Sequence, residues 1–197
     1  MNKVRLGDIC RVVSGSTPKS NVEEYWNGDI KWITPAEIAP DSYIIMDTER
    51  HITELAVKKT NLPLLPVGTV LLSSRAPIGK TAIVGEEMYC NQGFKNLICS
   101  DRVYNKYLYF FLNSQENYLK GLGRGTTFKE ISKGIVEDVE IPLPSIEEQK
   151  RAAEKFESIQ SLICNRKQVI VLLEKLVKSR FIEMFGDPII NVWGSET

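Results

Sequence analysis

The sequence predicts an α+β domain with a mixed or antiparallel sheet, followed by one long helix that forms a coiled coil. Two observations carry this prediction. Before Pro144, short strand-like runs alternate with turns that contain Gly or Pro, whereas no Gly or Pro follows Pro144 until Gly186. We therefore predict a globular domain over residues 1–144, a dimerisation helix over 145–185 and a C-terminal tail over 186–197. The 43% hydrophobic and 25% charged residues are typical of a folded domain of this length.

The strands and shorter helices follow from local patterns. Tyr104–Leu119 carries an apolar and aromatic face and predicts a helix, and Phe128–Lys133 predicts a short one. Strand-forming residues bounded by Gly, Pro or Asn turns predict strands at Asp29–Ile33, Thr69–Ser73, Thr81–Val84, Lys95–Cys99 and Val136–Ile141.

The long helix has a start signal, a stop signal and an apolar stripe. Ser145 and Glu148 form a capping box, and Gly186 with Pro188 ends the helix after about 40 residues, or about 60 Å. A single helix of this length cannot bury such a stripe, so pairing with another helix is favoured over packing on its own domain. The stripe has heptad spacing, broken only by Arg166, and its predicted dimerisation residues are Ala152, Phe156, Ile159, Ile163, Ile170, Leu173 and Val177.

Cysteine and histidine content argues against a metal site. There is no Cys-x-x-Cys pair, and His51 is the only histidine, in a polar stretch typical of the surface. We predict free, buried or half-buried thiols in a reducing compartment at Cys10, Cys90, Cys99 and Cys164. No apolar run reaches the roughly 20 residues of a membrane helix, and the N-terminus lacks a secretory stretch, so we expect a cytoplasmic protein with no membrane association.

No catalytic site is predicted. Ser74–Thr81 resembles a phosphate-binding loop, but it lacks the first glycine and leads into a β-branched run instead of a helix. Asn61–Leu64 lacks the Pro-Pro-aromatic continuation of adenine methyltransferases, and one histidine offers no base for a hydrolase. We expect neither an enzyme nor a bound cofactor.

Polar and basic loops point to a nucleic acid as the ligand. Zero net charge argues only against binding by bulk electrostatics, because a local basic surface remains possible. Lys120, Arg124, Lys129 and Lys133 fall in a stretch whose only acid is Glu130. Arginine suits guanine edges and amides suit adenine. Trp26, Trp32 and Phe94 could stack on bases, but core packing is favoured. The predicted DNA-facing residues are Ser16, Thr17, Lys19, Arg75, Lys80, Gln92, Lys95, Arg124, Thr126, Thr127 and Lys129.

The order of these segments resembles the specificity subunit of type I restriction–modification systems. That resemblance implies a non-catalytic subunit that reads DNA and docks methyltransferase (modification) subunits, and through them restriction subunits; S-adenosylmethionine and ATP belong to those partners. The stretches that carry it are Leu6–Ile9, Ser14–Pro18, Tyr25–Ile33, Pro66–Lys80, Asn91–Gly93, Gly125–Thr127 and Ile141–Gln149.

The sequence departs from this family in having one domain and one helix where members usually have two of each. It resembles a half-subunit, either natural or produced by truncation, and Phe185–Pro188 resembles the stretch that leads into a second domain. Two copies paired antiparallel through their helices would form a homodimer that reads a split palindrome. Two other readings stay open: a protein-interaction scaffold that binds no DNA, and a stand-alone DNA-binding regulator.

Overall fold

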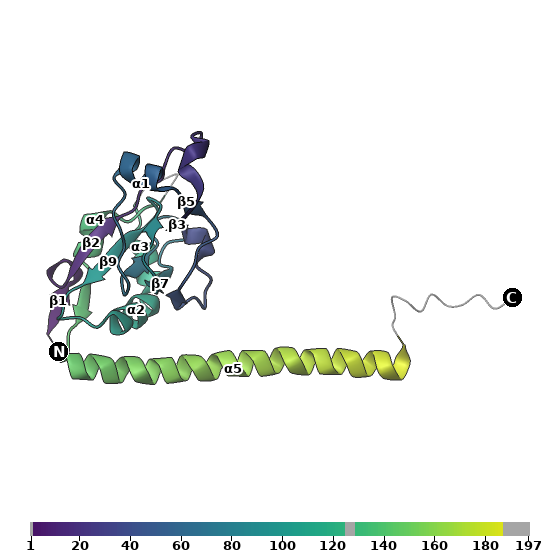
Figure 1. Cartoon of the computed structure of the whole chain (residues 1–197). Helices are drawn as coiled ribbons and strands as arrows, with labels where there is room; N and C mark the ends of the chain where they lie inside the picture. Colours follow the sequence, from purple (N-terminus) through teal and green to yellow (C-terminus); the bar gives the residue numbers. More distant parts are fainter. Residues whose placement is uncertain (1, 125–128, 187–197) are drawn as a thin grey trace. The chain divides into compact units, whose positions relative to one another are not determined.

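The computed structural model describes residues 2–124 and 129–186, and the chain divides into two compact units, Met1–Ala153 and Glu154–Thr197. The first unit contains three small sheets and several short helices, and α5 (Ile146–Phe185) begins in it and extends through the second (Figure 1). The predicted α+β class with mixed sheets and a long C-terminal helix is confirmed. No helix among the described residues is long and apolar enough to cross a membrane.

The sheets combine antiparallel and parallel pairs. Five strands follow the order β2-β9-β6-β7-β4, three follow β5-β3-β8, and β1 pairs with β10. The β4–β7 and β3–β8 pairs are parallel, and the others are antiparallel. The strands are β1 (Lys3–Arg5), β2 (Cys10–Ser14), β3 (Trp26–Ile33), β4 (Ile44–Ile45), β5 (His51–Ile52), β6 (Val70–Leu72), β7 (Thr81–Val84), β8 (Tyr89–Cys90), β9 (Lys95–Cys99) and β10 (Glu140–Pro142).

Three hydrophobic clusters form the core of the first unit. The largest joins β2, β6 and β9 to the helices α2 and α3, a second lies around β7 and β8, and a third surrounds Trp32. Alternate residues of β2 explain its contribution, because Cys10 and Val12 are buried while Arg11 between them is exposed. The helices of this unit are α1 (Glu54–Thr60), α2 (Asn105–Ser114), α3 (Glu116–Leu122) and α4 (Lys133–Glu137), with 3₁₀ turns at Leu6–Asp8, Glu23–Tyr25 and Pro35–Glu37.

Two predicted elements differ from the observed ones by more than their end residues. The predicted helix over Tyr104–Leu119 is two helices, because the chain leaves helical geometry at Gln115 (φ −98°, ψ 12°). The predicted strand over Val136–Ile141 is wrong in its first part, where α4 lies, and only β10 is a strand.

The short helix predicted over Phe128–Lys133 is also wrong in position. Ser132 explains the shift, because its hydroxyl accepts a hydrogen bond from the Ile135 N–H (3.4 Å) and starts α4 at the residue where the predicted helix ends. Val136 then packs into the core from a helix despite its preference for strands. Phe128 lies outside the described residues.

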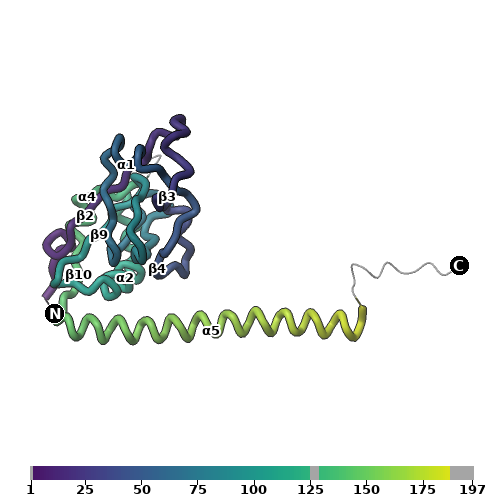
Figure 2. The backbone as a smooth tube through the Cα atoms, in the orientation of Figure 1, coloured from purple at the N-terminus to yellow at the C-terminus, as the bar shows by residue number. Residues whose placement is uncertain are grey.

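The start predicted for α5 and its stop at Gly186 are confirmed, whereas Pro188 lies outside the described residues. Ser145 N–H donates to the Glu148 carboxylate (3.0 Å), and the Glu148 N–H donates to the Ser145 hydroxyl (3.4 Å). At the other end Gly186 adopts a positive φ of 80° and its N–H bonds to Ile182 O (2.8 Å). Between these caps the helical backbone continues without interruption (Figure 2).

Candidate nucleic-acid interface

Loops that are far apart in sequence and carry predicted DNA-facing residues are linked by hydrogen bonds. The Ser16 N–H donates to Cys90 O (3.0 Å), and the Thr17 hydroxyl donates to the Gln92 side-chain oxygen. From the same region the Gly93 carbonyl accepts a bond from the Ser74 N–H (2.7 Å). The loops after β2, after β8 and after β6 therefore form one continuous group.

The first of these contacts requires a glycine. A Cβ atom built on Gly15 would lie 2.0 Å from the Asn91 carbonyl oxygen and 2.4 Å from the Cys90 sulfur. Such distances are far inside van der Waals contact, so no larger residue fits without moving one of the two loops. Gly15 thus permits the close approach that lets Thr17 reach Gln92.

Glu130 links the loop after β6 to the basic segment that follows α3. Its carboxylate contacts the Arg75 guanidinium (3.0 Å) and the Lys95 ammonium (3.1 Å). The neighbouring Ile131 N–H donates to Ser74 O (2.9 Å). Partial burial opposes ionisation of Glu130, but the hydrogen bonds and charges of Lys95 and Arg75 outweigh it and hold its pKa below the ordinary value.

A reciprocal pair of backbone bonds closes the segment that follows α3. The Arg124 N–H donates to Glu130 O (3.1 Å), and the Glu130 N–H donates to Arg124 O (3.0 Å). The Arg124 and Lys129 side chains are exposed. Thr126 and Thr127, which the sequence also predicts at the interface, lie outside the described residues.

Two predicted cations are engaged inside the domain. The Lys80 ammonium donates to the carbonyls of Pro35 (3.2 Å) and Ile38 (2.5 Å). Lys95 is only 8% exposed and faces Glu130. Thr17, Lys19, Arg75, Gln92, Arg124 and Lys129 are exposed, and Ser16 is half-buried.

Two tryptophans hold the loop that carries Ser16 and Lys19. The Trp32 indole N–H donates to Ser16 O (3.1 Å), and that of Trp26 donates to Lys19 O (3.3 Å). The rings meet edge to face with centroids 5.2 Å apart, and the Arg50 guanidinium lies 4.1 Å from the Trp26 ring centroid. Core packing is confirmed for Trp32 and Phe94, whereas Trp26 is half-buried.

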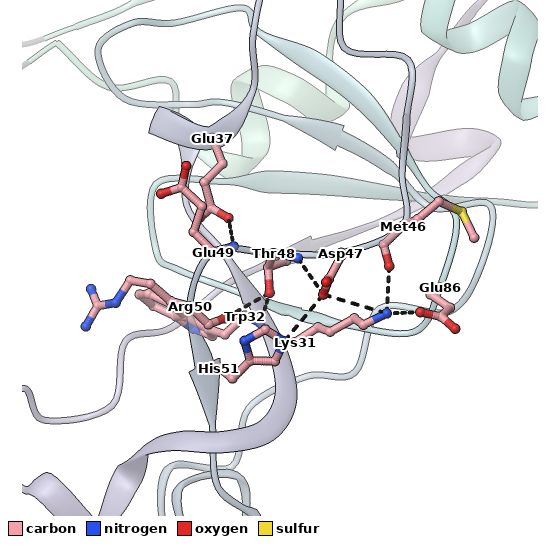
Figure 3. Close-up of polar contacts among 10 residues, drawn as sticks. All are labelled: Lys31, Trp32, Glu37, Met46, Asp47, Thr48, Glu49, Arg50, His51 and Glu86. Carbon is pink, nitrogen blue, oxygen red and sulfur yellow. Dashed lines mark hydrogen bonds and ion pairs between the residues drawn. The ribbon is translucent and has the colours of Figure 1, made fainter.

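A polar network around Lys31 and Trp32 holds strand β3 in place (Figure 3). The Thr48 hydroxyl accepts a bond from the Trp32 N–H (3.1 Å) and donates to Arg50 O (2.8 Å). Next to it Lys31 pairs with Glu86, and its ammonium donates to the Met46 carbonyl (2.6 Å). These contacts explain why Trp32 can hold the Ser16 loop in one position.

Two lysines of the predicted basic stretch, and His51, have partners within the domain. Lys120 pairs with Glu116 (2.8 Å) and Lys133 with Glu137 (3.5 Å), each within one helical turn. His51, predicted as a surface residue, is half-buried, and its ring lies within 3.4 Å of the Asp47 carboxylate.

Two further sequence interpretations concern Lys80 and the cysteines. The segment after Lys80 is the strand β7, which confirms that Ser74–Thr81 does not open a helix as a phosphate-binding loop does.

All four cysteines are free, but Cys164 on α5 is exposed, which corrects the expectation that it is buried or half-buried.

The predicted dimerisation stripe lies on the exposed surface of α5. Phe156 is 49% exposed, and each of the five later stripe residues is more than half exposed. Ala152 differs, because it belongs to the first unit and is half-buried there. The five residues are Ile159, Ile163, Ile170, Leu173 and Val177.

Several residues that shape the interface were not predicted from the sequence. Glu130 appeared only as the single acid in a basic stretch, and Arg50 carried no signal at all. The tryptophans could be assigned to the core, but their N–H donors could not be matched to Ser16 and Lys19. The isolated acid among four cations was the one usable signal, because an acid there is typical of an internal ion pair.

Comparison with known proteins agrees with this arrangement of loops and helix. Residues 1–175 match the family described as type I restriction modification DNA specificity domain, and the chain belongs to this family. It is 43% identical over 186 residues to the type I restriction enzyme MjaIX specificity subunit of Methanocaldococcus jannaschii, covering 93% of this chain and 43% of that protein. It is 27% identical over 164 residues to the EcoR124I/EcoR124II specificity subunit of Escherichia coli, covering 80% and 40%.

Solved structures share the fold. A chain from a study of complex assembly and conformational transition of the type I R-M system superimposes with a TM-score of 0.74 at 24% identity, covering 90% of this chain and 43% of that one. The HsdS subunit from Thermoanaerobacter tengcongensis gives 0.67 at 24% identity, covering 85% and 39%. The chain therefore spans less than half the length of these relatives.

Proposed function

We propose that this chain is a non-catalytic specificity subunit that recognises one half of a split target in double-stranded DNA. The observation that carries the proposal is the continuous group of loops, in which residues from Ser16 to Glu130 are linked by hydrogen bonds. Membership of the DNA specificity domain family supports it. Sequence-reading side chains need a rigid base, and the bonds to Trp32, Cys90 and Gly93 supply one.

Exposure divides the predicted residues into two proposed roles. Arg124 and Lys129 are exposed beside a closed loop and suit phosphate contacts, whereas Thr17, Arg75 and Gln92 suit polar contacts to base edges. Lys80 and Lys95 act as internal braces in this proposal, because their ammonium groups already bond to carbonyls and to Glu130. Ser16, Lys19, Thr126 and Thr127 remain predicted interface residues.

The neutral net charge is compatible with this role if partners share the DNA. The exposed cations of the loop group are local, and the chain as a whole carries 25 basic and 25 acidic residues. Weak non-specific binding follows, because phosphate attraction scales with the cations in contact. We propose that methyltransferase subunits dock on this chain and supply the remaining affinity, together with S-adenosylmethionine and the chemistry, and that restriction subunits join through them in the cytoplasm.

The exposed stripe of α5 supports a second part of the proposal. Two copies of the chain pair their helices antiparallel as a coiled coil, which buries Ile163 and Ile170. A two-fold axis then relates the two recognition domains, so that the homodimer reads the same half-site in inverted orientation.

The test is salt-dependent binding of DNA by the full chain assembled with its methyltransferase subunits. In Lys129→Ala, affinity for duplex DNA should fall and the slope of log affinity against log salt should drop by about 1. Lys3→Ala is the matched control, because Lys3 lies on β1 away from the loop group and should leave the slope unchanged. Equal effects of the two variants would contradict the assignment of the interface.

Binding of DNA by the chain alone and methylation mapping in cells separate the remaining readings. A protein-interaction scaffold shows no salt-dependent binding of DNA at all. A stand-alone regulator binds DNA, but cellular methylation patterns stay the same when its gene is removed. A specificity subunit is the reading in which both the binding and the methylation pattern depend on this chain.

A further inference from the structure

Two cysteines outside the proposed interface face one another across a strand pair. Cys10 on β2 is the direct partner of Cys99 on β9, and both are free thiols. Cys10 is buried and Cys99 is half-buried, and both pack against the largest hydrophobic cluster, so their side chains lie on the same side of the sheet.

The position in the antiparallel ladder brings these cysteines close together. The Ser100 N–H donates to Ile9 O (3.0 Å), so the preceding pair, Ile9 and Ser100, is a hydrogen-bonded one. Pairs alternate along an antiparallel ladder, so Cys10 and Cys99 occupy a non-hydrogen-bonded site, where Cα atoms lie about 4.5 Å apart. That separation falls within the range of about 4.4–6.8 Å that a disulfide spans.

The two cysteines are neighbours across the strand pair, and both lie at a surface hollow. The neighbouring Cys99 thiol, together with burial, raises the pKa of Cys10. The hollow that both cysteines line has a volume of about 530 Å³, and its charged residues are Asp8, Arg11, Lys133 and Glu137. A small disulfide reagent can therefore reach the pair from this hollow.

The other two cysteines lack this combination. Cys90 is 1% exposed, and its sulfur accepts a hydrogen bond from the Asn96 amide (3.0 Å). Cys164 is exposed on α5, and a residue in a helix has no cross-strand partner. They therefore serve as internal references for burial and for exposure.

We propose that Cys10 and Cys99 form a reversible dithiol–disulfide site that reacts with small-molecule disulfides such as oxidised glutathione. The Cys99 thiolate attacks one sulfur of the reagent, forms a mixed disulfide and releases one thiolate. Cys10 then loses its proton, displaces the second thiol and closes the Cys10–Cys99 bond. The two protein thiols are oxidised, and one disulfide reagent is reduced to two thiols.

The bond would fix an edge strand. Within the described residues β2 lies at the end of its sheet and pairs only with β9. A covalent link between Cys10 and Cys99 therefore ties β2 to the sheet interior at the end remote from Ser14. Because β2 leads directly into the loop that carries Ser16 and Lys19, oxidation stiffens the support of that loop.

The test uses the full chain carrying Cys164→Ser, which removes the exposed thiol. After equilibration with oxidised glutathione, peptide mapping without reductant should show the Cys10 peptide linked to the Cys99 peptide. The thermal unfolding midpoint should rise by about 5 °C, because the bond closes a long loop in the unfolded chain. Dithiothreitol should reverse both changes, and Cys90 should stay unmodified.

Cys99→Ser in the same background is the matched control, and it should show neither the linked peptides nor the higher midpoint. The proposal is overturned if Cys10 and Cys99 remain reduced under conditions in which Cys164 of the unmodified chain is fully converted to a mixed disulfide. It is equally overturned if either cysteine is recovered only as its glutathione adduct. Peptide mapping of the unmodified chain decides the matter even if Cys99→Ser fails to fold.

Discussion

The globular unit buries its large apolar side chains, whereas the part of α5 that follows it exposes them. In the globular unit Trp32, Phe94 and Leu97 are at most 1% exposed and lie within continuous clusters. On α5 beyond Glu154, Ile163 and Ile170 are more than half exposed although they recur with the regularity of a packed helix. Burial of apolar area is the main favourable term in folding. The globular unit therefore contains its own hydrophobic core, whereas the apolar stripe of α5 is exposed.

The comparison separates two kinds of sequence information. In the globular unit the apolar pattern specifies contacts within the chain, and the polar loops are positioned as a result. In α5 the heptad pattern lies on exposed residues, and we propose that it specifies a contact with a second copy of the chain. Changes in the two regions should therefore be detected by different measurements, unfolding for the first and association for the second.

The largest effect is expected from Trp32→Ala. Removing this fully buried ring should lower the free energy of unfolding of the globular unit by about 3–5 kcal/mol. Urea denaturation followed by circular dichroism measures the loss. Trp32→Phe is the control: it keeps an aromatic ring but loses the N–H that bonds to Ser16 O, so it should cost about 1–2 kcal/mol. A loss below 1 kcal/mol in Trp32→Ala would show that the ring is not part of a cooperative core.

Ile163→Glu should affect association and leave folding unchanged. Placing a carboxylate in the helix–helix seam should weaken self-association at least about 100-fold, or about 3 kcal/mol, as measured by sedimentation equilibrium. Gln168→Glu adds the same charge about 140° around the helix and should leave association intact. If both variants dimerise like the unmodified chain, the stripe does not pair two copies.

Gln149→Ala tests the region where the two patterns meet. This side chain is fully buried at the start of α5, and its amide bonds to the Tyr104 N–H (2.8 Å) and to the carbonyls of Arg102 (3.1 Å) and Pro144 (3.0 Å). Leaving these groups without partners should cost about 2–3 kcal/mol of unfolding free energy. Lys150→Ala, at the exposed next position, should stay within about 0.5 kcal/mol. Comparable losses in both variants would mean that the buried amide of Gln149 does not set the cost.

The smallest effect is expected from Glu130→Gln. One third of the Glu130 side chain is exposed, so loss of its charge should cost only about 1 kcal/mol at neutral pH. The pKa of Glu130 lies below its ordinary value of 4.5, so its contribution is fully present above that pH and is lost as pH falls through the lower folded pKa. The stabilities of the two proteins should therefore converge as the pH falls below 4.5. A gap that stays constant over this range would exclude the ion pairs as its cause.

Local signals explain which parts of the fold could be predicted. The capping box at Ser145, the stop at Gly186 and the strands β7 and β9 depend on neighbouring residues, and the sequence indicates them correctly. The strand predicted at Val136 failed because the cap at Ser132 and core packing outweighed local β propensity.

The candidate interface could be predicted as a set of residue types but not as a structure. Polarity and charge indicated the loops of Thr17, Gln92 and Arg75. The bonds that link them join positions up to 75 residues apart, and no local pattern encodes such pairings. The same limit applies to Lys80 and Lys95, whose charge suggested exposure. Lys80 instead bonds to a backbone carbonyl and Lys95 to the Glu130 carboxylate, both within the domain.

The pairing of β1 with β10 has a mechanical consequence. Lys3 is the partner of Pro142, and the Leu143 N–H donates to Asn2 O (3.1 Å), so the chain enters and leaves this ladder at the same end. A force that pulled Asn2 away from Leu143 would break the hydrogen bonds of the ladder one after another. It would not load all of them at once in shear. This two-stranded sheet is therefore the weakest element along the line of pull, and tension applied through α5 should open it before the five-stranded sheet gives way.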